Sequence, residues 1–295
     1  MSLEDLIITV YCHIEEMYQE AIKGIKLRPR GTAPDLSDEE VLTMLVVGEY
    51  LGLGSDKRIW AYFCQQWSQW FPKIGCRTSF IRQSANLMNV LSRMQQTLST
   101  QLCGYTDLYL FDGFPIPVCH IKRYKRKSPF KGLGAVGYCA AKDQKYFGFK
   151  GYLLISPQGA TRAFSIAAAN EDERDLLPEV VLGLTGDIIA DKGLIRPSLQ
   201  LELERQGLLL HTPLRKNMED VRPKEFLSQI MNVRRKIETV IGQLVERFCI
   251  QSIRAKDMWH LMMKVGRKIF AHSFCLLINK SINSEAPLQI EKLLA

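Results

Sequence analysis

The hydrophobic pattern of this chain changes its period near residue 105, and this change limits the possible folds more than any other feature. Apolar residues recur at helical spacing through residues 1–100. From residue 107 the pattern is that of strands, which then alternate with helices. The sequence therefore predicts a mixed α/β protein with an all-helical N-terminal domain.

Local sequence patterns indicate where the helices of the first hundred residues begin and end. Ser37 and Glu40 form a capping-box pair ahead of an apolar run, which is typical of a helix start. Prolines and a glycine make residues 26–35 a loop. The expected helices are 3–22, one that starts after Ser37, 56–71, and one that is capped by Thr78 or Ser79 and ends near residue 98.

Strand and helix signals alternate beyond residue 105. The expected strands are 107–112, 146–155, 161–168, 186–191 and 208–214. The expected helices begin at Asp172–Asp175 and span 196–207, 232–248 and 257–282. The first three strands suit an antiparallel meander, and the later alternation suits parallel strands. A five-stranded mixed sheet covered by helices is predicted.

Positive charge is concentrated in two blocks of the chain. The formal net charge is +8, and residues 101–160 and 221–295 carry most of the basic excess. Such blocks are typical of a polyanion-binding site, although a solubilising surface is the alternative. The eight cysteines show neither CxxC pairs nor zinc-finger spacing, the N-terminus lacks a basic leader pattern, and the apolar runs are short. A cytoplasmic protein without a membrane span is predicted.

Three carboxylates from distant parts of the chain are expected to converge. Asp112 and Asp191 stand at the ends of predicted strands, where open α/β sheets place their ligand sites. Glu238 lies beside the apolar stripe of a predicted helix. Clustered carboxylates repel one another unless a cation lies between them, and Mg²⁺ or Mn²⁺ suits such oxygen ligands. Asp187 and Glu246 compete for these roles, but a local backbone bond and a solvated surface position are expected for them.

The segments FDGFPIPV, IIADKG and RRKIE, in this order, resemble the DDE transposases of bacterial insertion sequences, most closely the insertion-sequence family numbered nine-eighty-two. The resemblance implies a ribonuclease-H-like catalytic core that cuts and joins DNA with divalent metal, Mg²⁺ or Mn²⁺, as two ions. It implies that Asp112, Asp191 and Glu238 are the catalytic metal ligands. Arg234 matches the arginine of the related Y-R-E-K signature. The implied division is an N-terminal domain at 1–100, a catalytic domain at 101–282 and a tail at 283–295.

A basic segment directly follows the strand of Asp112 and is the main candidate for contact with a DNA backbone. It is interleaved with Tyr124 and Phe130, and its cations are Lys122, Arg123, Lys125, Arg126, Lys127 and Lys131. Lys192 and Arg234 are candidates beside the carboxylates. Arg77 and Arg82 would contact DNA if the N-terminal helices form a helix-turn-helix reader. The alternative for these helices is a packing or dimerisation domain.

The predicted function is a transposase that cleaves the ends of a DNA element and joins them to target DNA. Double-stranded DNA is the expected partner, the protein is expected to form a homodimer on it, and nucleoid association is expected during activity. Two rival functions remain: a DNA-binding derivative without activity, and a nuclease of the same fold without strand transfer.

Overall fold

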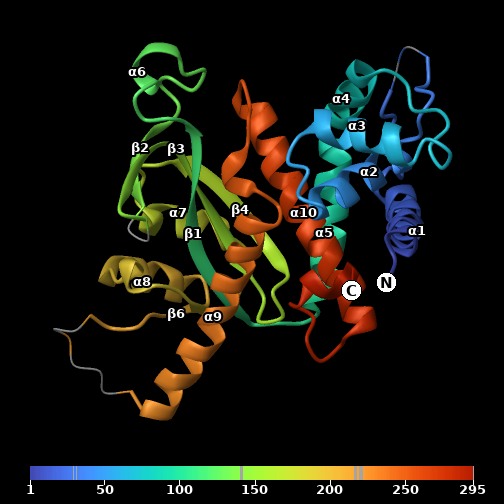
Figure 1. The fold of residues 1–295 in the computed structure, drawn as a ribbon. Coiled ribbons are helices and arrows are strands. Elements are labelled where there is room, and N and C mark those ends of the chain that lie inside the picture. Colours follow the sequence, from blue (N-terminus) through green and yellow to red (C-terminus); the bar gives the residue numbers. More distant parts are fainter. Residues whose placement is uncertain (29, 31, 140–141, 216–217, 219–221, 295) are drawn as a thin grey trace. The chain divides into compact units, whose positions relative to one another are not determined.

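The computed structural model describes residues 1–28, 30, 32–139, 142–215, 218 and 222–294, without the side chains of Arg126 and Lys127 (Figure 1). The chain divides into two compact units, one of residues 1–101 with 244–295 and one of residues 102–243. The functional division at 1–100, 101–282 and 283–295 stays a prediction. No helix of the described residues is long and apolar enough to cross a membrane.

The first unit is built of helices around a buried central one. This central helix, α2 (Asp38–Tyr50), packs against α1, α3, α4 and α10, and 11 of its 13 residues are buried. Its capping box is confirmed, because Ser37 Oγ accepts from the Glu40 N–H and the Glu40 carboxylate accepts from the Ser37 N–H. The other helices of this unit are α1 (Leu3–Ala21), α3 (Asp56–Gln66), α4 (Arg77–Asn86), α5 (Met88–Cys103) and α10 (Met258–Ile282), with 3-10 turns at Ile250–Ser252 and Ile290–Leu294.

The single helix predicted from Thr78 or Ser79 to residue 98 is wrong in two respects. Leu87 ends α4, and a separate helix, α5, starts at the next residue. Cys76 occupies the N-cap of α4, and no side chain caps it. Ser79 does not cap the helix because it lies inside α4 as the third residue, where its hydroxyl is 3.4 Å from Cys76 Sγ.

A network of buried charges joins α2, α3 and α10. Arg267 Nε donates to Glu49 Oε1 over 2.7 Å, and Arg267 also pairs with Asp56. Lys268 Nζ pairs with Glu49 and donates to the Phe248 carbonyl oxygen over 2.6 Å. Burial alone would raise the pKa of Asp56, but attraction to Arg267 prevails and lowers that pKa to about 2. Each charge in this network is therefore balanced by a close partner of opposite sign.

The second unit contains a mixed sheet, which has six strands within the described residues. They are β1 (Leu108–Cys119), β2 (Ala135–Cys139), β3 (Gln144–Ile155), β4 (Thr161–Ala168), β5 (Gly186–Ile189) and β6 (Leu208–His211). The order is β2-β3-β1-β5-β6, and β4 also pairs with β3. The antiparallel pairs β1–β3 and β3–β4 and the parallel pairs β1–β5 and β5–β6 match the prediction. The sixth strand, β2, was not predicted because it is short and interrupted by a glycine.

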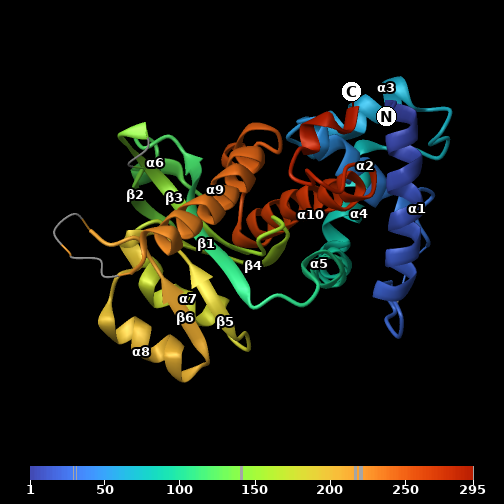
Figure 2. The same ribbon diagram turned by 90° about the horizontal axis from the view of Figure 1, so that it is seen from below.

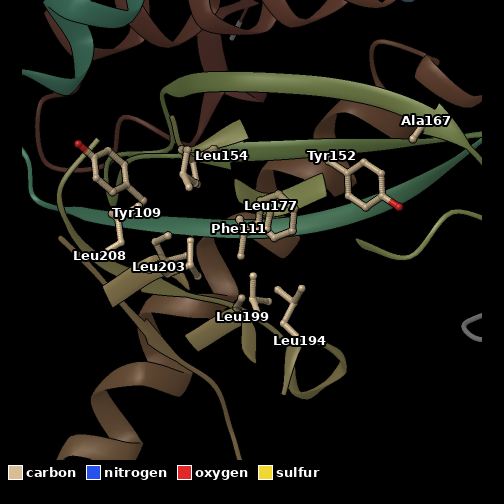
Figure 3. Packing of buried hydrophobic residues seen from close by; sticks show 13 residues of the cluster. Tyr109, Phe111, Tyr152, Leu154, Ala167, Leu177, Leu194, Leu199, Leu203 and Leu208 are labelled. Atoms are coloured by element: carbon tan, nitrogen blue, oxygen red, sulfur yellow. The ribbon is translucent and has the colours of Figure 1, made fainter. Parts of the chain in front are cut away.

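One face of this sheet is covered by α7 (Glu173–Val180) and α8 (Pro197–Arg205). Phe111 of β1 stacks on Tyr152 of β3, with ring centroids 5.9 Å apart, and Leu177 and Leu203 pack against the same core (Figure 3). Figure 2 shows the long helix α9 (Lys224–Glu246) across the sheet from α8. This helix begins eight residues before the predicted 232–248. The remaining elements are α6 (Tyr124–Lys127) and a 3-10 turn at Lys192–Leu194.

Candidate active site

Asp112 lies within β1, not at its end as predicted. The strand continues through a further seven residues to Cys119, because β3 pairs with it along this whole length. Tyr109 and Phe111 face the apolar core, so the alternation of a strand turns Asp112 toward the opposite face. The Asp112 carboxylate accepts a hydrogen bond of 2.8 Å from the Gly113 N–H.

Asp191 lies next to Asp112 because of the strand register. The parallel pair of β1 and β5 aligns Leu110 with Ile189. Asp112 follows Leu110 by two residues, and Asp191 follows Ile189 by two residues. In an extended chain, a step of two residues returns to the same face of a sheet. Asp191 is 40% exposed and directly precedes the 3-10 turn at Lys192–Leu194. The register of β1 and β5 and the short segment after β5 therefore bring Asp191 near Asp112, and the charge of Asp191 acts on the Asp112 carboxyl group.

Helix α9 supplies the third carboxylate together with an arginine. Arg234 and Glu238 are four residues apart and share one side of the helix. Arg234 Nη2 lies 3.4 Å from Asp191 Oδ1 and 3.4 Å from Glu238 Oε1. The Arg234 side chain is 17% exposed, and its Nε is buried without a hydrogen-bond partner. Arg234 thus links Asp191 to Glu238.

The electrostatic surroundings make Asp112 an unusual carboxyl group. Burial raises the pKa of Asp112 to about 6, and the charges of Asp191 and Glu173 act in the same direction. The Gly113 N–H and the positive charge of Arg234 act against them. Carboxyl groups that are buried beside like charges lower the stability of a protein. Such arrangements are therefore typical of functional sites.

Glu173 is a fourth carboxylate near this site, and sequence reasoning missed it. Its Oε2 lies 3.7 Å from Lys150 Nζ of β3, and its Oε1 lies beside the Cα of Gly193, where a Cβ would meet it at 2.6 Å. The same Cβ would lie 3.8 Å from Asp191 Oδ2. The sequence carried no distinguishing signal, since acidic residues are common in the first turn of any helix.

The raised pKa of Asp112 gives a prediction for the metal-free protein. The folded protein holds a proton on Asp112 up to about pH 6, whereas an unfolded aspartate loses it near pH 4. The free energy of unfolding should therefore fall by about 2–3 kcal/mol as the pH rises from about 4 to about 7. Denaturant titrations in chelator measure this change, and Asp112→Asn should remove that part of it. An equal pH dependence in the variant would contradict the assignment.

The two competing acids have other surroundings. Asp187 Oδ1 lies 2.6 Å from His211 Nε2 on the neighbouring strand β6. The local backbone bond that was predicted for Asp187 is thus replaced by a cross-strand pair, which the parallel register of β5 and β6 brings together. Glu246 is exposed at the end of α9, as predicted.

The basic segment after β1 is fixed by its aromatic residues. Tyr124 stacks on Phe147 at 4.8 Å, and Phe130 is 1% exposed and packs edge-on against Phe149. These rings hold the segment on β3. Four predicted DNA-binding cations of the segment are exposed: Lys122, Arg123, Lys125 and Lys131. The side chains of Arg126 and Lys127 lie outside the described part of the structure.

The remaining predicted DNA-binding residues are on the surface of their own units. Lys192 is exposed next to Asp191. Arg77 is the first residue of α4, Arg82 follows on the same helix, and both are exposed in the first unit. The second unit therefore contains Asp112, Asp191, Lys192, Arg234 and Glu238, and Arg234 contacts two of its carboxylates, those of Asp191 and Glu238.

The oxygen donors of the site fit Mg²⁺ or Mn²⁺ in chemical type. As the side chains stand, however, no three carboxylate, histidine or cysteine groups of the described residues are close enough together to hold a metal ion. The Arg234 guanidinium lies within 3.4 Å of two of the three candidate ligands. Its buried and unpartnered Nε shows that this arrangement leaves one polar group unsatisfied.

The mixed sheet, with acidic residues on β1, after β5 and on α9, has the ribonuclease-H-like fold. A family model described as "Transposase DDE domain" matches residues 102–258, so the chain belongs to this family. Among solved structures, the chain is similar to that described as "Cryo-EM structure of piggyBac transposase synaptic complex with hairpin DNA (SNHP)". The TM-score is 0.50 and the identity 11%, over 98% of this chain and 76% of that one. The search of curated proteins finds no match.

Proposed function

We propose that the protein is a transposase that uses divalent metal to cleave DNA at the ends of an insertion sequence and to join those ends to target DNA. The single observation that supports this best is the register of β1 and β5, because Asp112 and Asp191 each follow the aligned pair Leu110 and Ile189 by two residues. Arg234 contacts both Asp191 and Glu238 and so links Glu238 to Asp191. The motif resemblance supports an element of bacteria, related to the insertion-sequence family numbered nine-eighty-two, and hence a protein that works at the nucleoid.

In this proposal Asp112, Asp191 and Glu238 hold two ions of Mg²⁺ or Mn²⁺. Bound there, the ions supply an activated water and stabilise the leaving oxygen of an in-line phosphoryl displacement. The chain itself orients the DNA: Lys192 and Arg234 lie beside the carboxylates, and the basic segment after β1 offers its exposed cations to the phosphates. Residues 1–100, with Arg77 and Arg82, would recognise the element ends, and a homodimer would hold two of them.

Incubation of the purified protein with labelled element ends tests this function. Mg²⁺ and Mn²⁺ should support cleavage, whereas Ca²⁺, which prefers more ligands at longer distances, should support binding with little chemistry. Joined products with target DNA distinguish a transposase from a nuclease without strand transfer. Full cleavage in excess chelator would disprove the metal mechanism, and binding without any cleavage would indicate a DNA-binding derivative.

The basic segment gives a prediction about salt. Lys122→Gln, Arg123→Gln and Lys125→Gln together should weaken binding to all DNA sequences alike, because phosphates carry no sequence information. Each lost phosphate contact should reduce the slope of log K against log salt by about 0.9, so that three contacts reduce it by about 2.7. A salt titration of binding to end and random duplexes measures both effects.

The matched control neutralises three exposed lysines outside both the second unit and residues 1–100, namely Lys256, Lys280 and Lys292. It lowers the net charge of the protein by the same amount, and its salt slope should stay near that of the wild type. Equal slopes in the two triple variants would show that the basic segment is an ordinary solvated surface. A loss confined to end sequences would mean that this segment reads DNA sequence.

A further inference from the structure

Arg234 stands in an unusual place for a DNA-binding arginine. It is the most buried member of the ion-pair group, at 17% exposure against 40% for Asp191 and 53% for Glu238. Its guanidinium is directed at the carboxylates, with one nitrogen, Nη2, at 3.4 Å from an oxygen of each. An arginine that contacted only the DNA backbone would not need to lie beside the carboxylates of Asp191 and Glu238.

The contacts of Arg234 are those of a displaceable counter-ion. Charge-assisted hydrogen bonds to carboxylates are usually about 2.7–2.9 Å long, and both pairs here are clearly longer. The guanidinium can donate through a planar fork, yet its buried Nε has no acceptor. Arg234 therefore neutralises the carboxylates through long contacts while its Nε donor stays unsatisfied, so that little interaction energy is lost when a stronger cation replaces it.

A divalent cation is such a partner, and it needs the same oxygens. Mg²⁺ and Mn²⁺ bind carboxylate oxygens directly, and a guanidinium between two of these carboxylates excludes an ion by charge and by volume. The described residues accordingly contain no ready-made site of three ligands. Metal binding to Asp191 and Glu238 thus requires that the Arg234 guanidinium move away.

We propose that Arg234 is a positioning residue that competes with divalent metal for Asp191 and Glu238, and that its displacement by metal frees its guanidinium for a DNA phosphate. This inference rests on the proposed function, because it takes the metal site to be that of the transposase. Metal loading and phosphate binding become coupled: one side chain cannot serve both carboxylates and DNA, so metal and DNA favour each other's binding. The free protein is held in a state of low metal affinity.

The test is the affinity of the DNA-free full-length protein for Mn²⁺, measured by calorimetry. Arg234→Gln should bind Mn²⁺ about 3- to 30-fold more tightly than the wild type, which corresponds to the loss of one or two partly exposed ion pairs. Arg235→Gln is the matched control, since Arg235 is the next residue of α9 and is exposed. Its Mn²⁺ affinity should equal that of the wild type. Adding Asp191→Asn to Arg234→Gln should abolish the gain.

The direction of the change in Mn²⁺ affinity shows whether Arg234 competes with the metal or supports its binding. If Arg234 merely orients the ligands, Arg234→Gln binds Mn²⁺ more weakly than the wild type or equally well, and either result overturns the inference while leaving the proposed function in place. Absence of Mn²⁺ binding in every variant overturns the proposed function and the inference together. In Ca²⁺, Arg234→Gln should also lose about 0.9 of the salt slope of DNA binding, and an unchanged slope would refute the phosphate contact.

Discussion

Asp112→Asn is expected to reduce metal-dependent DNA cleavage by about a thousandfold or more while DNA binding persists. The substitution keeps the shape of the side chain and removes one ligand charge from the proposed metal site. Metal ions contribute several kcal/mol to such reactions, and each 1.4 kcal/mol is a factor of ten in rate. Cleavage of labelled element ends in Mg²⁺, with binding measured in Ca²⁺, gives the two quantities. Asp191→Asn and Glu238→Gln should behave in the same way.

Asp107→Asn is the matched control for this prediction. Asp107 is exposed directly before β1, and the change is chemically the same. The control should cleave normally. Asp112→Asn should in addition be at least as stable as the wild type at neutral pH in chelator, because a partly buried charge is gone. Near-normal cleavage by Asp112→Asn would remove Asp112 from the catalytic site, and failure to fold would contradict the electrostatic assignment.

Glu49→Gln is expected to destabilise the first unit by about 3–5 kcal/mol. The variant leaves the buried cations Arg267 and Lys268 with a single close carboxylate, that of Asp56 on Arg267. Removing one partner of a buried ion pair leaves an uncompensated charge, which is far more damaging than the loss of an exposed pair. A thermal melt of the full-length protein should show a fall on the order of 10 °C.

The exposed ion pair of Glu20 and Lys23 provides the comparison. Glu20→Gln makes the same chemical change on the surface, and it should alter the free energy of unfolding by no more than about 1 kcal/mol. A similar small effect for Glu49→Gln would mean that the buried network is not maintained by the charge of Glu49.

The strand and helix periods of the sequence were sufficient to predict the elements that carry the candidate site. The alternation around Asp112 indicated a buried strand, and the apolar stripe of α9 placed Glu238 beside it. What the period could not give was the length of β1. The strand extends past Asp112 because β3 pairs with it up to Phe147, and such pairing depends on residues far away in the chain. The end of a strand is thus set by its neighbour as much as by its own residues.

The neighbours of the carboxylates were also beyond sequence reasoning. Glu173 resembles any acidic residue of a first helical turn, and Lys150 resembles any polar residue of a strand. Only the packing of α7 on the sheet brings the two within 3.7 Å of each other. Likewise, no glycine or proline marks the point near Leu87 where the predicted fourth helix is divided into α4 and α5. In each case the structure depends on contacts between residues that share no local sequence pattern.

The continuation of β1 beyond Asp112 sets a length scale for the DNA complex. Cys119, the last residue of β1 before the basic segment, is the seventh residue after Asp112. At about 3.3 Å per residue they span roughly 20–23 Å. A duplex that follows this strand rises about 3.4 Å per base pair. On the proposed function, its backbone would then meet the cations about six or seven base pairs from the scissile phosphate, and the strand would set the distance between the cut and the basic segment.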